Sequence, residues 1–372
     1  MKKQTKTNRI APWTGMSLVL AFVIGLCFIL PGCGATKKQE AGSASDGTVS
    51  EEPFEFTSWN DGAPALEALK EYVQDVTDEN SEHFIPKEDR IATFDMDGTL
   101  YGELAPIYVD WWLYEYRVNE DSSFRPDKAE KAVADQIAEA AKTGSIPENI
   151  EEDHAVQAAR AFAGMTISGY RQYVREFLKK DVVGFDHMTY KDAFYLPMQE
   201  IVGYLIENDF NVYICSGTDR FLCRELADGI LPIADDHFIG MDVMLKARGQ
   251  GNKDGLDYVY TSDDEVVRTD ELLLKTVKMN KVSILARELG QPPVLSFGNS
   301  SGDASMAEYT MSNNPYYSKA FMVVADDDVR EYGDPEKAAE KKSDWESRGW
   351  ETISMKNDWK TIYGGNVKRT SK

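Results

Sequence analysis

Apolar residues recur along the chain at two spacings, one typical of helices and one of buried strands. The helical spacing appears first in 64–76, at Leu66, Leu69, Tyr72 and Val76. The segment 90–94, with apolar Ile91, Ala92 and Phe94, predicts a short buried strand. From 104 to 180 the pattern is helical again, interrupted by turn signals that contain Gly and Pro. The first half of the chain therefore predicts a helix, a strand and a block of helices.

Strand and helix patterns alternate in the second half. Apolar runs predict strands at 211–215, 294–297 and 321–325, and helical spacing predicts helices at 197–207 and 280–289. Between them, β-rich sequence around a Gly-rich turn predicts a hairpin within 238–268. Such alternation predicts an α/β fold, with a mostly parallel sheet, helices on both faces and a helical insertion after the first strand. No internal repeat is present.

Three polar loops follow three of the predicted strands, at 95–99, 216–218 and 299–303. In open parallel sheets, ligands bind outside the carboxyl ends of the strands. We therefore expect these loops to converge on one site.

The first of these loops carries two carboxylates, Asp95 and Asp97, followed by Gly98 in a sharp turn. Side chains two residues apart on an extended chain point in the same direction, so we expect both carboxylates to lie on the same side of the loop. One can act as a nucleophile, and the other can protonate a leaving group and then deprotonate water. An isolated Asp-x-Asp is usually a solvated turn, but the preceding apolar strand and the following Gly-Thr-Leu favour a catalytic loop.

The loops resemble, in order, the four motifs of the haloacid dehalogenase superfamily. The matching elements are 95–100, Ser216, Lys281 and 297–303, and the resemblance extends over about 56–372. The helical insertion lies between the first and second motifs, as in phosphoserine-phosphatase-like members. Segments 90–100, 297–303 and 350–363 resemble, more closely, a group of exported bacterial phosphatase-like proteins whose substrates are mostly unassigned.

The resemblance implies hydrolysis of phosphomonoesters with Mg²⁺ as cofactor. Asp95 would attack phosphorus and form an aspartyl-phosphate, with Asp97 as general acid and base. The metal residues would be Asp95, Asp97, Asn299 and Asp303. The phosphoryl group would be bound by Ser216, the Gly217 amide and Lys281, with Thr99 ordering the loop around it.

One position departs from the superfamily pattern. The metal loop commonly begins with Gly-Asp, whereas here the residue after Gly298 is Asn299. Asn can ligate a cation through its carbonyl oxygen but brings no negative charge. Asn299 therefore supports an alternative, a lipoprotein that binds a phosphorylated ligand without turnover. Intact Asp95, Asp97, Ser216 and Lys281 favour catalysis, and phosphotransfer is a third possibility.

The insertion offers further candidates for substrate contact. Glu103, just after the nucleophile loop, is placed either to meet a substrate or to begin a helix. The aromatic residues can form a cage for a quaternary ammonium or pack the insertion: Trp111, Trp112, Tyr114 and Tyr116. Arg171 and Arg175 can meet an anionic substrate or form salt bridges, and salt bridges are the default.

The N-terminus has the pattern of an export signal. Four basic residues precede an apolar run at 16–30, too short to span a bilayer. Segment 30–33, Leu-Pro-Gly-Cys, resembles the lipobox of bacterial lipoproteins, which implies lipidation of Cys33 and an extracytoplasmic location on the cell membrane. The expected organisation is a signal peptide (1–32), a flexible tether (33–55), a catalytic core (56–103 and 190–372) and a helical cap (104–189).

Composition narrows the range of partners. With 41 Lys and Arg against 63 Asp and Glu, the formal net charge is −22, which argues against nucleic-acid binding. The expected partners are a small phosphorylated substrate and, through the lipid anchor alone, a membrane. Cys215 and Cys223 lie in apolar sequence, which favours free buried thiols over a disulfide. The sequence pattern indicates no oligomeric state.

Overall fold

The computed structural model describes residues 54–103 and 106–370. The predicted signal peptide (1–32), Cys33 and all but the end of the predicted tether lie outside these ranges. Within them, no helix combines the length and the apolar run that crossing a bilayer requires.

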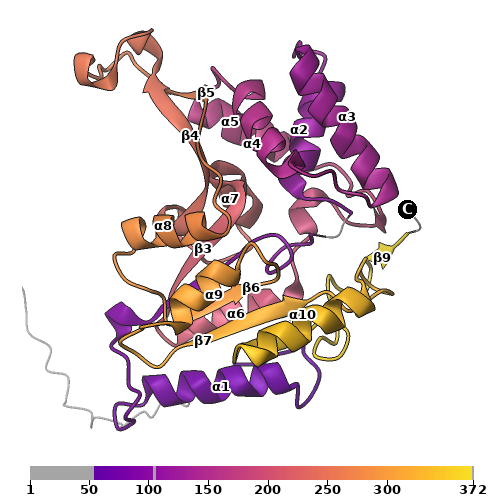
Figure 1. Ribbon diagram of the computed structural model, residues 1–372, viewed down its shortest axis with the longest axis vertical. Coiled ribbons are helices and arrows are strands. Elements are labelled where there is room, and N and C mark those ends of the chain that lie inside the picture. The colour runs from indigo at the N-terminus through magenta and orange to yellow at the C-terminus, as the bar shows by residue number, and fades with distance from the viewer. Residues whose placement is uncertain (1–53, 104–105, 371–372) are drawn as a thin grey trace, which may run out of the picture. The chain divides into compact units, whose positions relative to one another are not determined.

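One sheet of seven strands organises the described chain, in the order β5-β4-β3-β1-β6-β7-β8 (Figure 1). The pairs are parallel except β4 with β5, which form an antiparallel hairpin. The strands are β1 (Ile91–Phe94), β3 (Asn211–Asp219), β4 (Phe238–Ala247), β5 (Val266–Leu274), β6 (Leu295–Gly298), β7 (Lys319–Val324) and β8 (Glu351–Ser354). A separate antiparallel pair joins β2 (Phe185–Asp186) to β9 (Lys368–Arg369).

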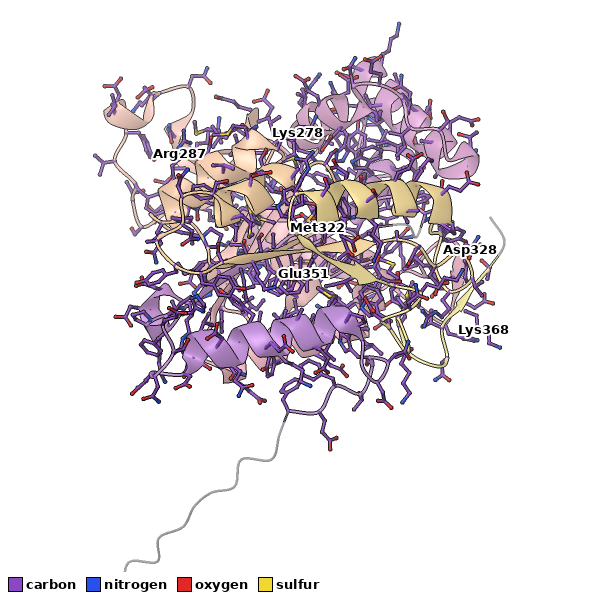
Figure 2. All side chains as sticks on the ribbon, turned by 60° about the horizontal axis from the view of Figure 1, so that its bottom comes forward. Lys278, Arg287, Met322, Asp328, Glu351 and Lys368 are labelled. Atoms are coloured by element: carbon purple, nitrogen blue, oxygen red, sulfur yellow. The ribbon has the colours of Figure 1, made fainter. Side chains whose placement is uncertain are left out.

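Helices cover both faces of this sheet. They are α1 (Pro64–Thr77), α6 (Leu196–Glu207), α7 (Arg220–Ala227), α8 (Met279–Glu288), α9 (Ala304–Met311) and α10 (Pro335–Ser347). Strand β7 divides its side chains between the two faces, because successive residues point to opposite sides. Phe321 packs in the cluster that contains Leu66 of α1, whereas Met322 packs with Trp345 of α10. Figure 2 accordingly shows α1 and α10 on opposite sides of the strand that carries Met322.

The segment between β1 and β3 forms the helical insertion. Its helices are α2 (Val109–Asn119), α3 (Lys128–Thr143), α4 (Ile150–Ala161) and α5 (Ile167–Phe177). Helix α3 begins at a capping box, in which Asp127 accepts from the amide of Glu130 and Glu130 accepts from the amide of Asp127.

The insertion is joined to the sheet at two separate places. At the first, the two chain crossings lie side by side, and the Gly102 amide donates to the Ala193 carbonyl at 2.8 Å. At the second, the turn before α5 pairs with β5 through two backbone hydrogen bonds. Gly164 N donates to Arg268 O at 2.8 Å, and Arg268 N donates to Met165 O at 2.9 Å.

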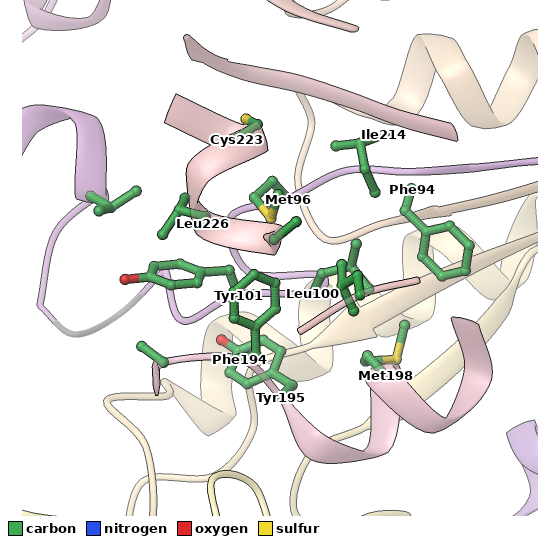
Figure 3. Close-up of a cluster of buried hydrophobic side chains, with 14 of the residues drawn as sticks. Phe94, Met96, Leu100, Tyr101, Phe194, Tyr195, Met198, Ile214, Cys223 and Leu226 are labelled. Atoms are coloured by element: carbon green, nitrogen blue, oxygen red, sulfur yellow. The ribbon is translucent and has the colours of Figure 1, made fainter. Parts of the chain in front are cut away.

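A buried apolar cluster lies beneath the loop that follows β1 (Figure 3). Met96 and Leu100 of this loop are fully buried and belong to the same cluster as Phe194. Because Met96 points into the cluster, its neighbours Asp95 and Asp97 are turned to the other side of the loop. Apolar burial thus fixes the orientation of the two carboxylates.

The structure confirms the predicted α/β class, the parallel sheet with helices on both faces and the helical insertion. The prediction of a loop at 216–218 was wrong, because β3 continues to Asp219 with a register shift after Cys215. Helix α10 and strand β8 were not predicted. Cys215 and Cys223 are buried free thiols.

A buried carboxyl group near the C-terminal end of the described chain connects fold stability to pH. Glu331 accepts hydrogen bonds from the Tyr363 hydroxyl and, at 2.8 Å, from the Tyr332 amide. Burial raises the pKa of Glu331 from 4.5 to about 7, although both hydrogen bonds oppose the shift.

We expect Glu331→Gln to make the protein more stable, relative to wild type, as the pH rises. Because the folded-state pKa of Glu331 exceeds its unfolded value, its contribution to stability is complete below about pH 4.5 and is lost as the pH rises through about 7. The relative gain is at most about 3 kcal/mol, at ~1.4 kcal/mol per pKa unit. Urea unfolding of both proteins at several pH values measures it, and a difference that does not change with pH contradicts the prediction.

Candidate active site

A pocket of about 210 Å³ lies at the carboxyl ends of β1, β3 and β6, where the loops after β1 and β6 meet the last residues of β3. This volume is below the ~300–1,000 Å³ of sites for drug-sized ligands, so it suits a small molecule. Residues of the sheet loops line one part and residues of the insertion line the rest: Asp95, Asp97, Glu103, Tyr108, Asp110, Trp111, Glu151, Gly217, Thr218, Lys275, Val277, Lys278, Lys281, Asn299, Ser300, Ser301, Gly302 and Asp303.

Lys281, in the first turn of α8, is buried between two carboxylates. Its Nζ lies 2.5 Å from Asp95 Oδ1 and 2.6 Å from Asp303 Oδ1, and it donates to the Cys215 carbonyl at 2.5 Å. These contacts use all three donors of the ammonium group. Burial alone lowers the pKa of Lys281, but the charges of Asp303 and Asp95 raise it overall. Lys281 is therefore a fixed positive charge beside the candidate nucleophile.

Asp97 differs from Asp95 in its contacts, because Lys281 opposes by direct contact the rise in pKa that burial and Asp303 cause at Asp95. The Oδ2 of Asp97 accepts a hydrogen bond of 2.6 Å from the Thr218 hydroxyl, whereas its Oδ1 is buried without a hydrogen-bond partner. Burial raises the pKa of Asp97, and the Thr218 hydrogen bond and the charge of Lys275 oppose this shift. A carboxyl group that tends to keep its proton is suited to general-acid chemistry.

Asp303 orders the loop after β6. Its Oδ2 accepts from the amides of Asn299 and Ser300, both at 3.1 Å, and from the Ser300 hydroxyl at 3.0 Å. Since Oδ1 is paired with Lys281, both oxygens of Asp303 bind protein groups. The predicted contact of Asp303 with a cation stays a prediction.

Asn299 and Glu103 come from elements 196 positions apart and meet at the rim of the pocket. The Asn299 amide nitrogen Nδ2 donates to Glu103 Oε2. This contact depends on Gly98, whose φ is +76°, because a Cβ there would lie 1.9 Å from Nδ2 and 2.4 Å from Oε2. Burial raises the pKa of Glu103 to about 7, against the charge of Lys341.

Two predicted residues lie apart from the pocket lining. Ser216 is buried and its hydroxyl accepts from the Thr218 amide at 3.1 Å, so Gly217 and Thr218 form the pocket wall at this strand. Thr99 is fully buried, and its hydroxyl has no hydrogen-bond partner within the described residues. The other predicted site residues in the described chain all line the pocket: Asp95, Asp97, Glu103, Gly217, Lys281, Asn299 and Asp303.

Sequence reasoning missed several charged residues of the pocket. Lys275 donates to the Gly217 carbonyl at 2.9 Å and lies 3.9 Å from Asp110. Burial raises the pKa of Asp110 to about 7, and its Oδ2 has no hydrogen-bond partner. A signal for the lysines was present, because Lys275, Lys278 and Lys281 follow one another at intervals of three residues.

The oxygen atoms of the pocket fit a small hard cation. In the part of the chain that the structure describes, no three His, Cys, Asp or Glu side chains gather as a metal-binding group. Mg²⁺ does not need such a group, because it keeps several waters and is usually held by one or two carboxylates together with substrate phosphate. Asp95, Asp97, whose Oδ1 has no hydrogen-bond partner in the described chain, and the Asn299 carbonyl oxygen would hold it.

The aromatic residues of α2 mainly pack the insertion. Trp111 and Tyr114 are buried around His154, and Tyr116 contacts Phe177. Of the four residues considered for a cage, Trp111 lines the pocket.

The two arginines of α5 form salt bridges. Arg175 lies 2.8 Å from Glu225 of α7, and Arg171 pairs with the same carboxylate. They therefore join the insertion to the core.

The fold and the pocket define an α/β protein with paired carboxylates at the end of a parallel strand. No family model and no curated protein matches the chain. Among solved structures, a conserved functionally unknown protein from Anaerococcus prevotii DSM 20548 is similar, with a TM-score of 0.49, 11% identity, and coverage of 85% of this chain and 97% of that one.

Two further solved structures are similar at comparable levels. A protein with unknown function from Bordetella pertussis Tohama I has a TM-score of 0.46, 14% identity, and coverage of 71% of this chain and 97% of that one. Cytosolic 5'-nucleotidase IIIB bound to cytidine has a TM-score of 0.44, 11% identity, and coverage of 77% and 84%. Likenesses this weak assign no activity to the chain.

Proposed function

We propose that this chain is a phosphatase of the haloacid dehalogenase type, which hydrolyses small phosphomonoesters through an aspartyl-phosphate on Asp95. The observation that carries the proposal is the buried contact of Lys281 with both Asp95 and Asp303, in a pocket that Asp97 also lines. The pocket thus brings together a nucleophile (Asp95), a fixed positive charge (Lys281) and a carboxyl group with a raised pKa (Asp97).

The reaction follows from the two environments of the carboxylates. A carboxylate oxygen of Asp95 attacks phosphorus while the bond to the ester oxygen breaks, and Asp97 gives its proton to that oxygen. Water then attacks the same phosphorus, and Asp97 takes a proton from it. The phosphorus–Asp95 bond breaks, which releases inorganic phosphate and restores both carboxyl groups to their starting states.

The rest of the pocket binds the phosphoryl group. The Gly217 amide would donate to a phosphoryl oxygen, and Lys281, whose donors are already bound, would contribute positive charge. Bound Mg²⁺ supplies positive charge that offsets repulsion between the phosphate and the carboxylates. Asp95, Asp97 and Asn299 are the residues that would hold it.

We expect phosphatase activity to require a divalent cation. For the purified full chain with p-nitrophenyl phosphate, EDTA should lower the rate at least about a hundredfold, or ~2.7 kcal/mol in barrier. Added Mg²⁺ should restore it. The control is EDTA already saturated with Mg²⁺, which should have no effect. Equal rates with and without EDTA contradict the cation-dependent mechanism.

The rival proposal is a protein that binds a phosphorylated ligand without turnover. Asn299 favours it, because the amide leaves the cation site with less negative charge than the usual Asp. Tight phosphate binding with no release of p-nitrophenol from any ester would support this rival. Formation of a new phosphate ester from an added alcohol would support phosphotransfer.

We also propose that the protein is exported and anchored through lipid on Cys33. The support comes from the sequence alone: the basic start, the apolar run at 16–30 and the Leu-Pro-Gly-Cys segment. Metabolic labelling with a fatty acid, lost in Cys33→Ser, tests this proposal.

A further inference from the structure

The contact between Asn299 and Glu103 affects which end of the Asn299 amide is available to a bound cation. The two ends of an Asn amide have nearly the same shape, but only the carbonyl oxygen can ligate a cation. The NH₂ end carries partial positive charge and would oppose one. An Asp has two equivalent oxygens and needs no such selection. The side chain of Asn299 therefore has to be held in one of two orientations.

Glu103 distinguishes between these orientations. In its ionised form Glu103 only accepts hydrogen bonds, so the end of the Asn299 amide that faces it is then the NH₂ group. The structure contains this contact, from Nδ2 to Glu103 Oε2. Once Nδ2 is bound there, the carbonyl oxygen Oδ1 is turned away from Glu103. Asn299 lines the pocket together with Asp95 and Asp97.

The local backbone is shaped to allow this contact. Gly98, the residue after Asp97, leaves the space that Nδ2 and Oε2 occupy. The amide and carbonyl of Asn299 are also held, by Asp303 at 3.1 Å and by Lys341 at 3.4 Å. With the backbone fixed from both sides, the remaining freedom of Asn299 is in its side chain.

We propose that Glu103 is a positioning residue, which orients the Asn299 amide so that its carbonyl oxygen, and not its NH₂ group, is the cation ligand. The inference rests on the proposed function for the presence of a cation. It assigns Glu103 a role in the cation site in place of the substrate contact expected from its sequence position. This orientation also explains how Asn299 can ligate a cation at a position where metal loops commonly have Asp.

The test is a comparison of Mn²⁺ affinity in two pairs of full-length variants, measured from the EPR signal of the free ion at about pH 8, where Glu side chains are mostly ionised. In the first pair, wild type and Glu103→Gln, the loss should be at least about tenfold, as for other groups that orient metal ligands. In the second pair, Asn299→Asp with and without Glu103→Gln, the loss should stay within about threefold, since a carboxylate needs no orientation.

Glu115→Gln is the matched control, because Glu115 accepts a hydrogen bond of 2.9 Å from the side-chain amide of Asn119 and does not line the pocket. It should change Mn²⁺ affinity less than about threefold. If Glu103→Gln does not fold, Glu103→Asp, which withdraws the carboxylate by one methylene, replaces it with the same expected results. Equal losses of Mn²⁺ affinity in the two pairs would show that Glu103 acts through its charge alone. No loss in the first pair would show that Glu103 does not affect the cation site. Either result overturns the inference.

The results also separate this inference from the proposed function. Hydrolysis that needs Asp95, with unchanged Mn²⁺ affinity in Glu103→Gln, overturns the inference and leaves the phosphatase proposal intact. The expected pattern of Mn²⁺ affinities in a chain that hydrolyses no phosphate ester supports the inference and overturns the phosphatase proposal.

Discussion

Asp95→Asn should lower the turnover of phosphate esters at least about a thousandfold, the range expected when a covalent nucleophile is removed. The amide has nearly the same shape as the carboxylate but cannot form the aspartyl-phosphate. Because Lys281 keeps its contacts with Asp303 and the Cys215 carbonyl, the fold should survive the change. Steady-state hydrolysis of p-nitrophenyl phosphate with Mg²⁺ is the measurement.

The matched control for Asp95→Asn is the same chemical change far from the pocket. Asp135 lies exposed on α3 and pairs with Lys131 on the surface. Asp135→Asn should keep turnover within about twofold of wild type, since exposed pairs contribute little. An Asp95→Asn protein that folds and turns over at the wild-type rate would exclude Asp95 as the nucleophile.

Lys281→Met should be the most destabilising substitution in the pocket, at about 3–5 kcal/mol, the usual cost of removing one partner from a buried ion pair. Without the ammonium group, Asp95 and Asp303 are left as two buried carboxylates that face one vacated position. The Cys215 carbonyl also loses its hydrogen-bond donor. Urea unfolding of wild type and variant measures the difference.

A second substitution identifies the cause of this loss. Adding Asp95→Asn to Lys281→Met removes one of the two uncompensated charges, so the double variant should be more stable than Lys281→Met by about 1–2 kcal/mol. If the double variant is the less stable of the two, lost packing rather than uncompensated charge explains the effect.

The sheet and the catalytic loop could be predicted because their signals are local. Strand β1 (Ile91–Phe94) is buried along its whole length, as both faces are covered, and the two acids follow it closely. The meeting of segments 95–97, 217–218 and 299–303 in one pocket then followed from the geometry of parallel sheets, although 217–218 belongs to a strand and not to a loop. Lys281 was identified by resemblance, and the structure brings it against Asp95.

The remaining parts of the pocket depend on tertiary contacts, which cannot be predicted from the spacing of residues along the sequence. Thr218, which lies within the register shift of β3, lines the pocket and donates to Asp97, whereas Ser216, predicted to bind the phosphoryl group, does not line it. The pairing of Glu103 with Asn299 joins residues 196 positions apart. From the sequence, Asp110 is an acidic residue in the first turn of a helix, which is common. In the structure it is buried near Lys275.

The two attachments of the insertion have a consequence for how ligands exchange. One attachment is the paired chain crossing at Gly102 and Ala193, and the other joins Gly164 and Met165 to Arg268 on the edge strand β5. Rotation of the insertion about the crossing requires the two hydrogen bonds at β5 to break, together with the salt bridges of Arg171 and Arg175 to Glu225. The amide protons of Gly164 and Arg268 would then become exposed to water. The hydrogen-exchange rates of these two amides therefore report how often the pocket opens, and slow exchange would set an upper limit on the rate of product release.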